Sequence, residues 1–121
     1  MNITIEDLKK IKKENPTLWR HGFEKKLNWI EKVFIPYEEV SFDEFKKCTE
    51  WMLENLEPKT QKSRFELDSY AIKHIIEQQL GGHISHGSAI AAGIFLKLPT
   101  SRIDGKSMIF KVKSKVKQTR F

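Results

Sequence analysis

Apolar residues recur at three- and four-residue intervals through most of the chain, which predicts a series of amphipathic helices. The first helix begins at Thr4, a capping residue that Asp7 can answer, and ends at Asn15-Pro16. The second continues to Pro36, and the third begins at the capping box Ser41-x-x-Glu44. The predicted buried positions are Ile5, Leu8 and Ile11 in the first helix, Trp19, Phe23, Leu27, Ile30 and Phe34 in the second, and Phe42, Phe45, Thr49, Met52 and Leu56 in the third.

Residues 68–98 carry the most constrained pattern. Asp68 or Ser69 can cap a helix of about three turns, which stops at Gly81-Gly82. Ser85 then caps a second helix, residues 86–98, whose side chains are apolar or small almost all round. A helix of this kind is buried, so we predict that it forms the centre of the fold. Two helices joined by a short glycine turn also have the outline of a helix-turn-helix.

The first of these two helices has a polar face, which we expect to lean toward solvent and to place Tyr70 beside His74. With the two histidines of the turn, this face provides the candidate partner-binding residues: Tyr70, Lys73, His74, Glu77, His83 and His86. Bases are read mainly by Arg, Lys, Asn and Gln, whereas the second helix offers only His86, Ser88 and Lys97. Helix packing is therefore favoured over sequence-specific DNA reading.

After Pro99 the pattern changes from helical to alternating. Asp104-Gly105 is a favoured hairpin turn, and lysine occupies every second position from Lys111 to Lys117. In a strand these lysines would lie about 6.6–6.8 Å apart on one face, near the spacing of phosphates along a nucleic-acid strand. The alternatives are an edge protected against aggregation and a solubilising tail. The candidate nucleic-acid-binding residues are Lys106, Lys111, Lys113, Lys115, Lys117 and Arg120.

These elements predict a mainly α protein, with a compact helical domain over residues 1–98 and a basic β-hairpin or tail of the same domain over residues 99–121. Residues 68–98 would be its helix-turn-helix-like centre, and a winged-helix-like α+β fold is the alternative. A chain of 121 residues can bury a core without disulfides, and its one cysteine, Cys48, cannot form an internal bridge. We expect a cytoplasmic monomer or dimer that contacts no membrane.

The net charge of +6 is unevenly distributed. Residues 97–121 carry eight Lys or Arg against one Asp, whereas residues 31–57 carry three basic and eight acidic side chains. The molecule should therefore have an acidic side and a basic end, a polarity that favours orientation against a polyanion.

The sequence does not contain a recognisable catalytic or metal-binding motif. Gly81-Gly82 lacks the context of a phosphate-binding loop, G-x-S-x-G does not occur, and no histidine lies near Cys48 in sequence. His83-x-x-His86 spans a joint and lacks the glutamate of H-E-x-x-H. We predict a protein that is not an enzyme and that needs no metal or other cofactor.

One stretch of the chain resembles a known pattern. Ser69-Tyr70-x-x-Lys73-His74-x-x-Glu77, followed by Gly82-His83-Ile84-Ser85-His86-Gly87 and an Ile-x-Ala run, is similar to S-Y-x-L-K-H-x-x-E and G-Y-[IV]-S-N-G in small proteins encoded by phages, plasmids and other bacterial mobile elements. It differs at His83, at His86 and at Lys97-Leu98-Pro99, where those proteins have Tyr, Asn and a Gly-Phe ending. The resemblance covers about a quarter of the chain and implies an origin in a mobile element.

Two functional classes remain open. One is a nucleic-acid-binding accessory protein of a phage or mobile element, which uses its lysine row on phosphates or on a nucleoprotein complex. The other is an anti-CRISPR or related anti-defence inhibitor that binds a host effector protein directly.

Overall fold

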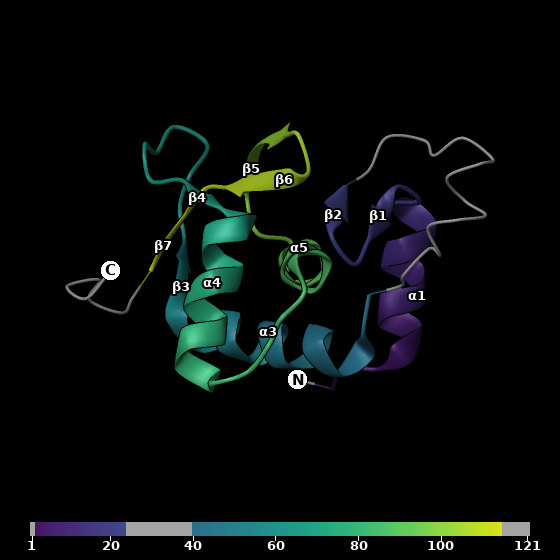
Figure 1. Cartoon of the computed structure of the whole chain (residues 1–121). Helices are drawn as coiled ribbons and strands as arrows, with labels where there is room; N and C mark the ends of the chain where they lie inside the picture. The colour runs from purple at the N-terminus through teal and green to yellow at the C-terminus, as the bar shows by residue number, and fades with distance from the viewer. Residues whose placement is uncertain (1, 24–39, 115–121) are drawn as a thin grey trace.

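The structure, a computed structural model, describes residues 2–23 and 40–114, and this part of the chain contains both helices and strands (Figure 1). The prediction of a mainly α fold is wrong, because seven short strands form three small sheets beside four helices in the described residues. The fold is therefore α+β. The helices are α1 (Ile5–Glu14), α3 (Phe42–Asn55), α4 (Ser69–Leu80) and α5 (His86–Phe95). The strands are β1 (Leu18–Trp19), β2 (Gly22–Phe23), β3 (Leu56–Pro58), β4 (Leu67–Asp68), β5 (Thr100–Asp104), β6 (Ser107–Phe110) and β7 (Val112–Ser114).

Helix α5 lies at the centre of the fold, which confirms the prediction from its apolar sequence. Its residues 86–93 are all buried, and α1, α3 and α4 pack around it (Figure 1). It ends at Phe95 rather than Leu98, because Lys97 adopts a positive φ of 55° and the N–H of Leu98 donates to the carbonyl of Gly93. A helix enclosed in this way cannot enter a DNA groove, so α4 and α5 do not form a base-reading helix-turn-helix.

The predicted hairpin turn at Asp104-Gly105 is confirmed. Strands β5 and β6 pair antiparallel on either side of it, and β4 pairs with the other edge of β6. The prediction of a single lysine-lined strand is wrong within the described residues, because the chain divides at Lys111 into two strands with different partners. Strand β6 is wholly buried, whereas β7 pairs with β3. A hairpin after two helices partly fits the winged-helix alternative.

The helix predicted to follow Pro16 is wrong over residues 18–23, where β1 and β2 form a hairpin. Gly22 has a φ of 106°, a left-handed backbone conformation that favours glycine, and a Cβ there would overlap the carbonyl oxygen of Lys106. Contacts distant in sequence therefore override the helical spacing of Trp19 and Phe23. The other predicted core positions of this helix, Leu27, Ile30 and Phe34, lie outside the described residues.

The helix starts follow the sequence closely. The capping box of Thr4 and Asp7 is complete. Ser41 accepts the N–H of Glu44 at 3.4 Å, but the Glu44 carboxylate bonds to another element, so the second capping box forms only in part. None of the helices within the described ranges has the length and apolar composition that crossing a membrane requires.

Candidate functional site: a cleft lined by lysine and histidine

A cleft of about 400 Å³ opens where the β1–β2 turn, the start of α4, the α4–α5 joint and the β5–β6 turn meet. Its volume is within the range of ligand-binding pockets. No Asp or Glu is among the described residues that line it. The lining consists of His21, Tyr70, Lys73, His83, Ser85, His86, Lys106 and Ser107.

The cleft unites residues that the sequence analysis assigned to two separate surfaces. Tyr70, Lys73, His83 and His86 come from the predicted partner-binding set, and Lys106 comes from the predicted nucleic-acid-binding set. His74 and Glu77 are not among the lining residues. His21, Ser85 and Ser107 were missed as site residues, and His21 carried no signal because residues 18–23 have the spacing of a helix.

Two close backbone approaches bring His21 into the cleft. The N–H of Phe23 donates to the carbonyl of Lys106 at 3.0 Å, so β2 lies against the β5–β6 turn. The N–H of Gly87 donates to the carbonyl of Arg20 at 2.8 Å, so the β1–β2 turn lies against the start of α5. The cleft is therefore formed by tertiary contacts and not by one local motif.

A buried serine connects three elements beneath the cleft. The Oγ of Ser69, at the start of α4, lies 2.7 Å from Nε2 of His86 and accepts the N–H of Met108 from β6 at 3.0 Å. Burial lowers the pKa of His86 below its usual value, although the Asp68 carboxylate and the His21 backbone act in the opposite direction. His86 is only 7% exposed, so a small part of its side chain reaches the cleft that it helps to line.

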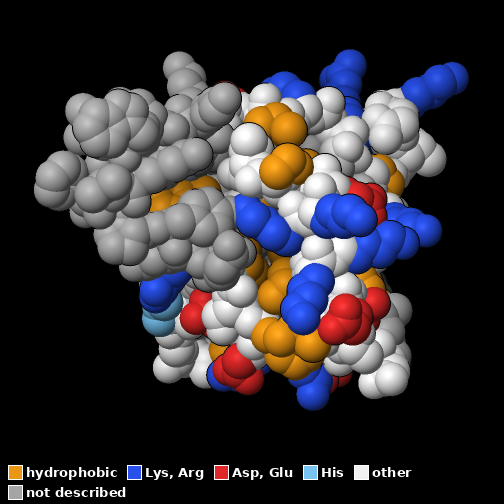
Figure 2. Space-filling model, turned by 90° about the vertical axis from the view of Figure 1, so that its right-hand side faces the viewer, with side chains coloured by type: hydrophobic (Ala, Val, Ile, Leu, Met, Phe, Trp, Pro, Cys, Tyr) orange, Lys and Arg blue, Asp and Glu red, His pale blue; other side chains and the backbone are white. Residues whose placement is uncertain are grey.

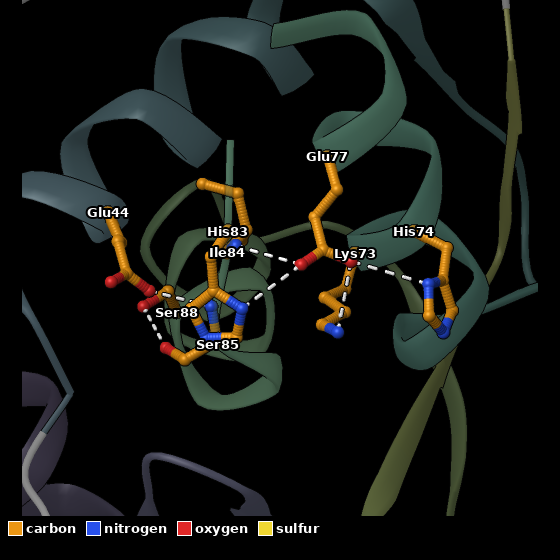
Figure 3. A network of polar contacts seen from close by, with 8 residues as sticks. All are labelled: Glu44, Lys73, His74, Glu77, His83, Ile84, Ser85 and Ser88. Carbon is orange, nitrogen blue, oxygen red and sulfur yellow. Dashed lines mark hydrogen bonds and ion pairs between the residues drawn. The ribbon is translucent and has the colours of Figure 1, made fainter. Parts of the chain in front are cut away.

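Glu77 organises the joint between α4 and α5 (Figure 3). One carboxylate oxygen accepts Nζ of Lys73 at 3.0 Å and lies 3.3 Å from Nδ1 of His74. The other oxygen accepts the N–H of Ile84 at 3.0 Å and lies 3.3 Å from Nδ1 of His83. The prediction that Lys73 and Glu77 lean into solvent is therefore wrong, and the side chain of Lys73 is only 13% exposed. An ammonium group has three N–H donors, so Lys73 can hold Glu77 and still donate into the cleft.

Glu44, which the sequence predicts as the second partner of the Ser41 capping box, bonds to the start of α5 instead. Its Oε1 accepts the N–H of Ser85 at 2.6 Å, which places a carboxylate from α3 at the positive end of α5 (Figure 3). The hydroxyl of Ser85 lies 2.6 Å from that of Ser88. The Ser85 side chain therefore does not accept a hydrogen bond from an N–H of α5. The contact with Glu44 of α3 holds Ser85 in the wall of the cleft.

The other predicted site residues lie in different surroundings. Tyr70 and His74 are neighbours as predicted, with ring centroids 4.4 Å apart, and His83 is 61% exposed. Lys111 is engaged within the protein: its Nζ donates to the carbonyl of Ser63 at 2.7 Å and pairs with Glu66 at 3.2 Å. Lys113 lies over the ring of Phe65. Lys115, Lys117 and Arg120 lie outside the described residues.

Comparison of the chain with family models, curated proteins and solved structures finds no match. The resemblance to mobile-element proteins therefore stays a prediction. Within the described ranges, no three His, Cys, Asp or Glu side chains converge as metal ligands. The functional argument therefore depends on the chemistry of the cleft.

The Glu77 contacts predict an acid-sensitive contribution to stability. Burial acts to raise the pKa of Glu77, but the N–H of Ile84 and the Lys73 ammonium outweigh it, so the pKa lies below its usual value of 4.5. A carboxyl whose pKa is lower in the folded state contributes stability above the unfolded pKa, and this stability is lost as the pH falls through the folded pKa. We expect Glu77→Gln to be less stable than wild type at pH 7, and the difference to shrink below pH 4.5.

Urea unfolding at pH 7 and at about pH 3 measures this difference. Glu54→Gln is the matched control, because Glu54 is exposed on α3 and should give wild-type stability at both pH values. If the Glu77→Gln difference were the same at both pH values, the negative charge of Glu77 would not be the stabilising feature.

Proposed function

We propose that the protein is a non-enzymatic nucleic-acid-binding protein that holds backbone phosphates in the cleft. The observation that carries this proposal is the lining itself: Lys73 and Lys106 are accompanied by histidines and hydroxyl groups and by no carboxylate among the described lining residues. Lysine ammonium groups and serine and tyrosine hydroxyls are common donors to phosphate oxygens. A carboxylate in the lining would repel phosphate. Glu77 pairs with Lys73 and His83 but is not itself among the described lining residues, so the surface that a ligand would meet favours an anion.

The distribution of charge along the chain also favours the binding of a polyanion near Lys106. Lys106 belongs to residues 97–121, which carry eight Lys or Arg against one Asp. The side of the molecule on which α1 lies is different, because basic side chains there lie among acidic and hydrophobic ones (Figure 2). On α1 itself, for example, Lys9 pairs with Glu6. The C-terminal segment that contains Lys106 therefore carries a larger net positive charge than α1, which favours a polyanion as its partner.

Two groups that could suggest covalent catalysis are inaccessible. The Ser69 and His86 side chains lie within hydrogen-bonding distance, as in a nucleophile and its base, but Ser69 has no exposed surface. Cys48 is likewise fully buried, and its burial raises the pKa of the thiol above its usual value, which disfavours the reactive thiolate. These features support binding rather than covalent catalysis.

The proposal predicts the effect of Lys106→Gln. This variant removes one cation from the cleft but keeps the backbone carbonyl that accepts the N–H of Phe23. Because phosphate contacts carry no sequence information, the variant should weaken binding to the same extent for oligonucleotides of unrelated sequence. Fluorescence anisotropy with two such oligonucleotides at low salt measures the effect.

Lys46→Gln is the matched control, since it removes an equal charge from an exposed position on α3, at the opposite side of the view in Figure 1 from the β5–β6 hairpin. We expect it to bind as wild type does. A wild-type protein that bound neither oligonucleotide at low salt would overturn the proposal, and a protein-directed inhibitor would then become the better account.

A further inference from the structure

Phe65, in the loop between β3 and β4, presents an aromatic ring that is bracketed by cations. The residue is 50% exposed, and the Nζ atoms of Lys59 and Lys113 lie 5.5 Å and 5.1 Å from its ring centroid. A single exposed apolar side chain is ordinary on a protein surface. An exposed ring with two lysine ammonium groups around it is the combination that proteins use to hold single-stranded nucleic acid.

The backbone around Phe65 is held in place by several hydrogen bonds and ion pairs. Lys111 donates its Nζ to the carbonyl of Ser63 and accepts the N–H of Lys59 at 2.9 Å through its own carbonyl. Glu66 pairs with Lys111 at 3.2 Å and with Arg102 at 3.3 Å. The loop backbone that carries the ring is therefore held in place before any ligand arrives.

We infer that Phe65 is a stacking platform for an unpaired base of single-stranded nucleic acid, and that Lys59 and Lys113 contact the phosphates beside that base. The inference rests on the proposed function and names its partner class. A base inside a duplex already stacks on both of its neighbours, so only an unpaired base offers a free face to the ring.

The platform and the cleft both adjoin the sheet formed by β4, β6 and β5. Phe65 lies two residues before β4 and Lys106 lies in the β5–β6 turn, while the strand order of this sheet is β4-β6-β5. In Figure 1, the loop before β4 and the β5–β6 hairpin both lie along the upper edge of the view. Glu57 pairs with Lys59 at 3.0 Å and lies opposite Lys113 in the β3–β7 register, so both lysines have the same acidic neighbour.

The experiment compares three ligands at the same salt concentration: a single-stranded oligothymidylate of about 12 nucleotides, a duplex of the same length, and inorganic polyphosphate, which has charge but no bases. We expect wild type to bind the single strand more tightly than the duplex. Phe65→Ala should weaken single-strand binding by roughly 5- to 150-fold and leave polyphosphate binding unchanged, because a stacked base is lost but no charge is removed.

Three further variants separate stacking from apolar contact. Phe65→Trp, which keeps an aromatic face, should bind the single strand at least as tightly as wild type, whereas Phe65→Leu should resemble Phe65→Ala. Leu80→Ala is the control. Leu80 is also 50% exposed, but it lies at the C-terminal end of α4, whereas Phe65 lies in the loop that leads to the N-terminal end of that helix at Asp68. Thermal melts of all variants establish that they are folded.

The possible outcomes distinguish the platform from the proposed function. If Phe65→Ala bound the single strand as tightly as wild type, or lost polyphosphate binding to the same extent, the platform would be disproved while nucleic-acid binding would stand. If wild type bound none of the three ligands, the proposed function would fail, and the platform with it.

Discussion

Gly87→Ala is expected to destabilise the protein severely, although alanine normally favours a helix over glycine. A Cβ at this position would lie 2.9 Å from the carbonyl carbon of Trp19 and closer still to its oxygen. These are backbone atoms, which cannot rotate away as a side chain can. The Gly87 N–H that bonds to Arg20 lies at the same contact and would be displaced with it. We expect a loss of about 3 kcal/mol or more, measured by urea unfolding.

Two other glycines provide a graded comparison. At Gly93 a Cβ would lie 2.7 Å from Cε1 of Phe110 and closer to Cζ, but a ring can shift, so Gly93→Ala should cost about 1–3 kcal/mol. At Gly82 nothing lies within 4 Å of the added atom, so Gly82→Ala should have the smallest effect. If Gly87→Ala were as stable as Gly82→Ala, this result would contradict the close packing of the β1–β2 hairpin on α5. It would also contradict the position of His21 in the cleft, which depends on that packing.

Ser69→Ala should give the second large loss of stability. Its hydroxyl is fully buried and serves both Nε2 of His86 and the N–H of Met108. Removing it leaves two buried polar groups without that partner, each at a cost of about 1–3 kcal/mol, so we expect a total on the order of 2–6 kcal/mol. Thermal or urea unfolding measures the change.

Ser88→Ala is the control for this prediction. Ser88 is equally buried, but the bond removed is a single contact with the hydroxyl of Ser85, and we expect a loss of about 1 kcal/mol. Equal losses in Ser69→Ala and Ser88→Ala would show that the contacts of Ser69 with α5 and β6 contribute little.

The features predicted well from the sequence are those fixed by neighbours along the chain. Thr4 and Asp7 form their capping box, Gly81 ends α4 in a left-handed conformation, and α5 is buried as its small and apolar residues require. The strands could not be predicted in this way. Strands β3 and β4 have three and two residues, too few for an alternating pattern, and they exist because β7 and β6 pair with them.

The residues of the candidate site likewise include some that the sequence could place and others that it could not. Tyr70 and Lys73 could be placed on one face of a helix from spacing alone, and His83 in the joint after it. His21 and Ser107 could not, because they reach the cleft through the approach of β2 to the β5–β6 turn. Helical spacing predicts the direction of the Glu77 side chain, but it gives no information on the backbone N–H of Ile84 that the carboxylate accepts.

The salt dependence of binding tests the central claim, that nucleic-acid phosphates occupy the cleft. Each phosphate that a lysine neutralises releases counterions, so the logarithm of affinity falls linearly with the logarithm of salt concentration. The account predicts that Lys106→Gln makes this slope shallower than that of wild type by about 1, while Lys46→Gln leaves it unchanged. A wild-type protein that binds nucleic acid with the same slope as Lys106→Gln would contradict the account, because its phosphate contacts would then lie outside the cleft.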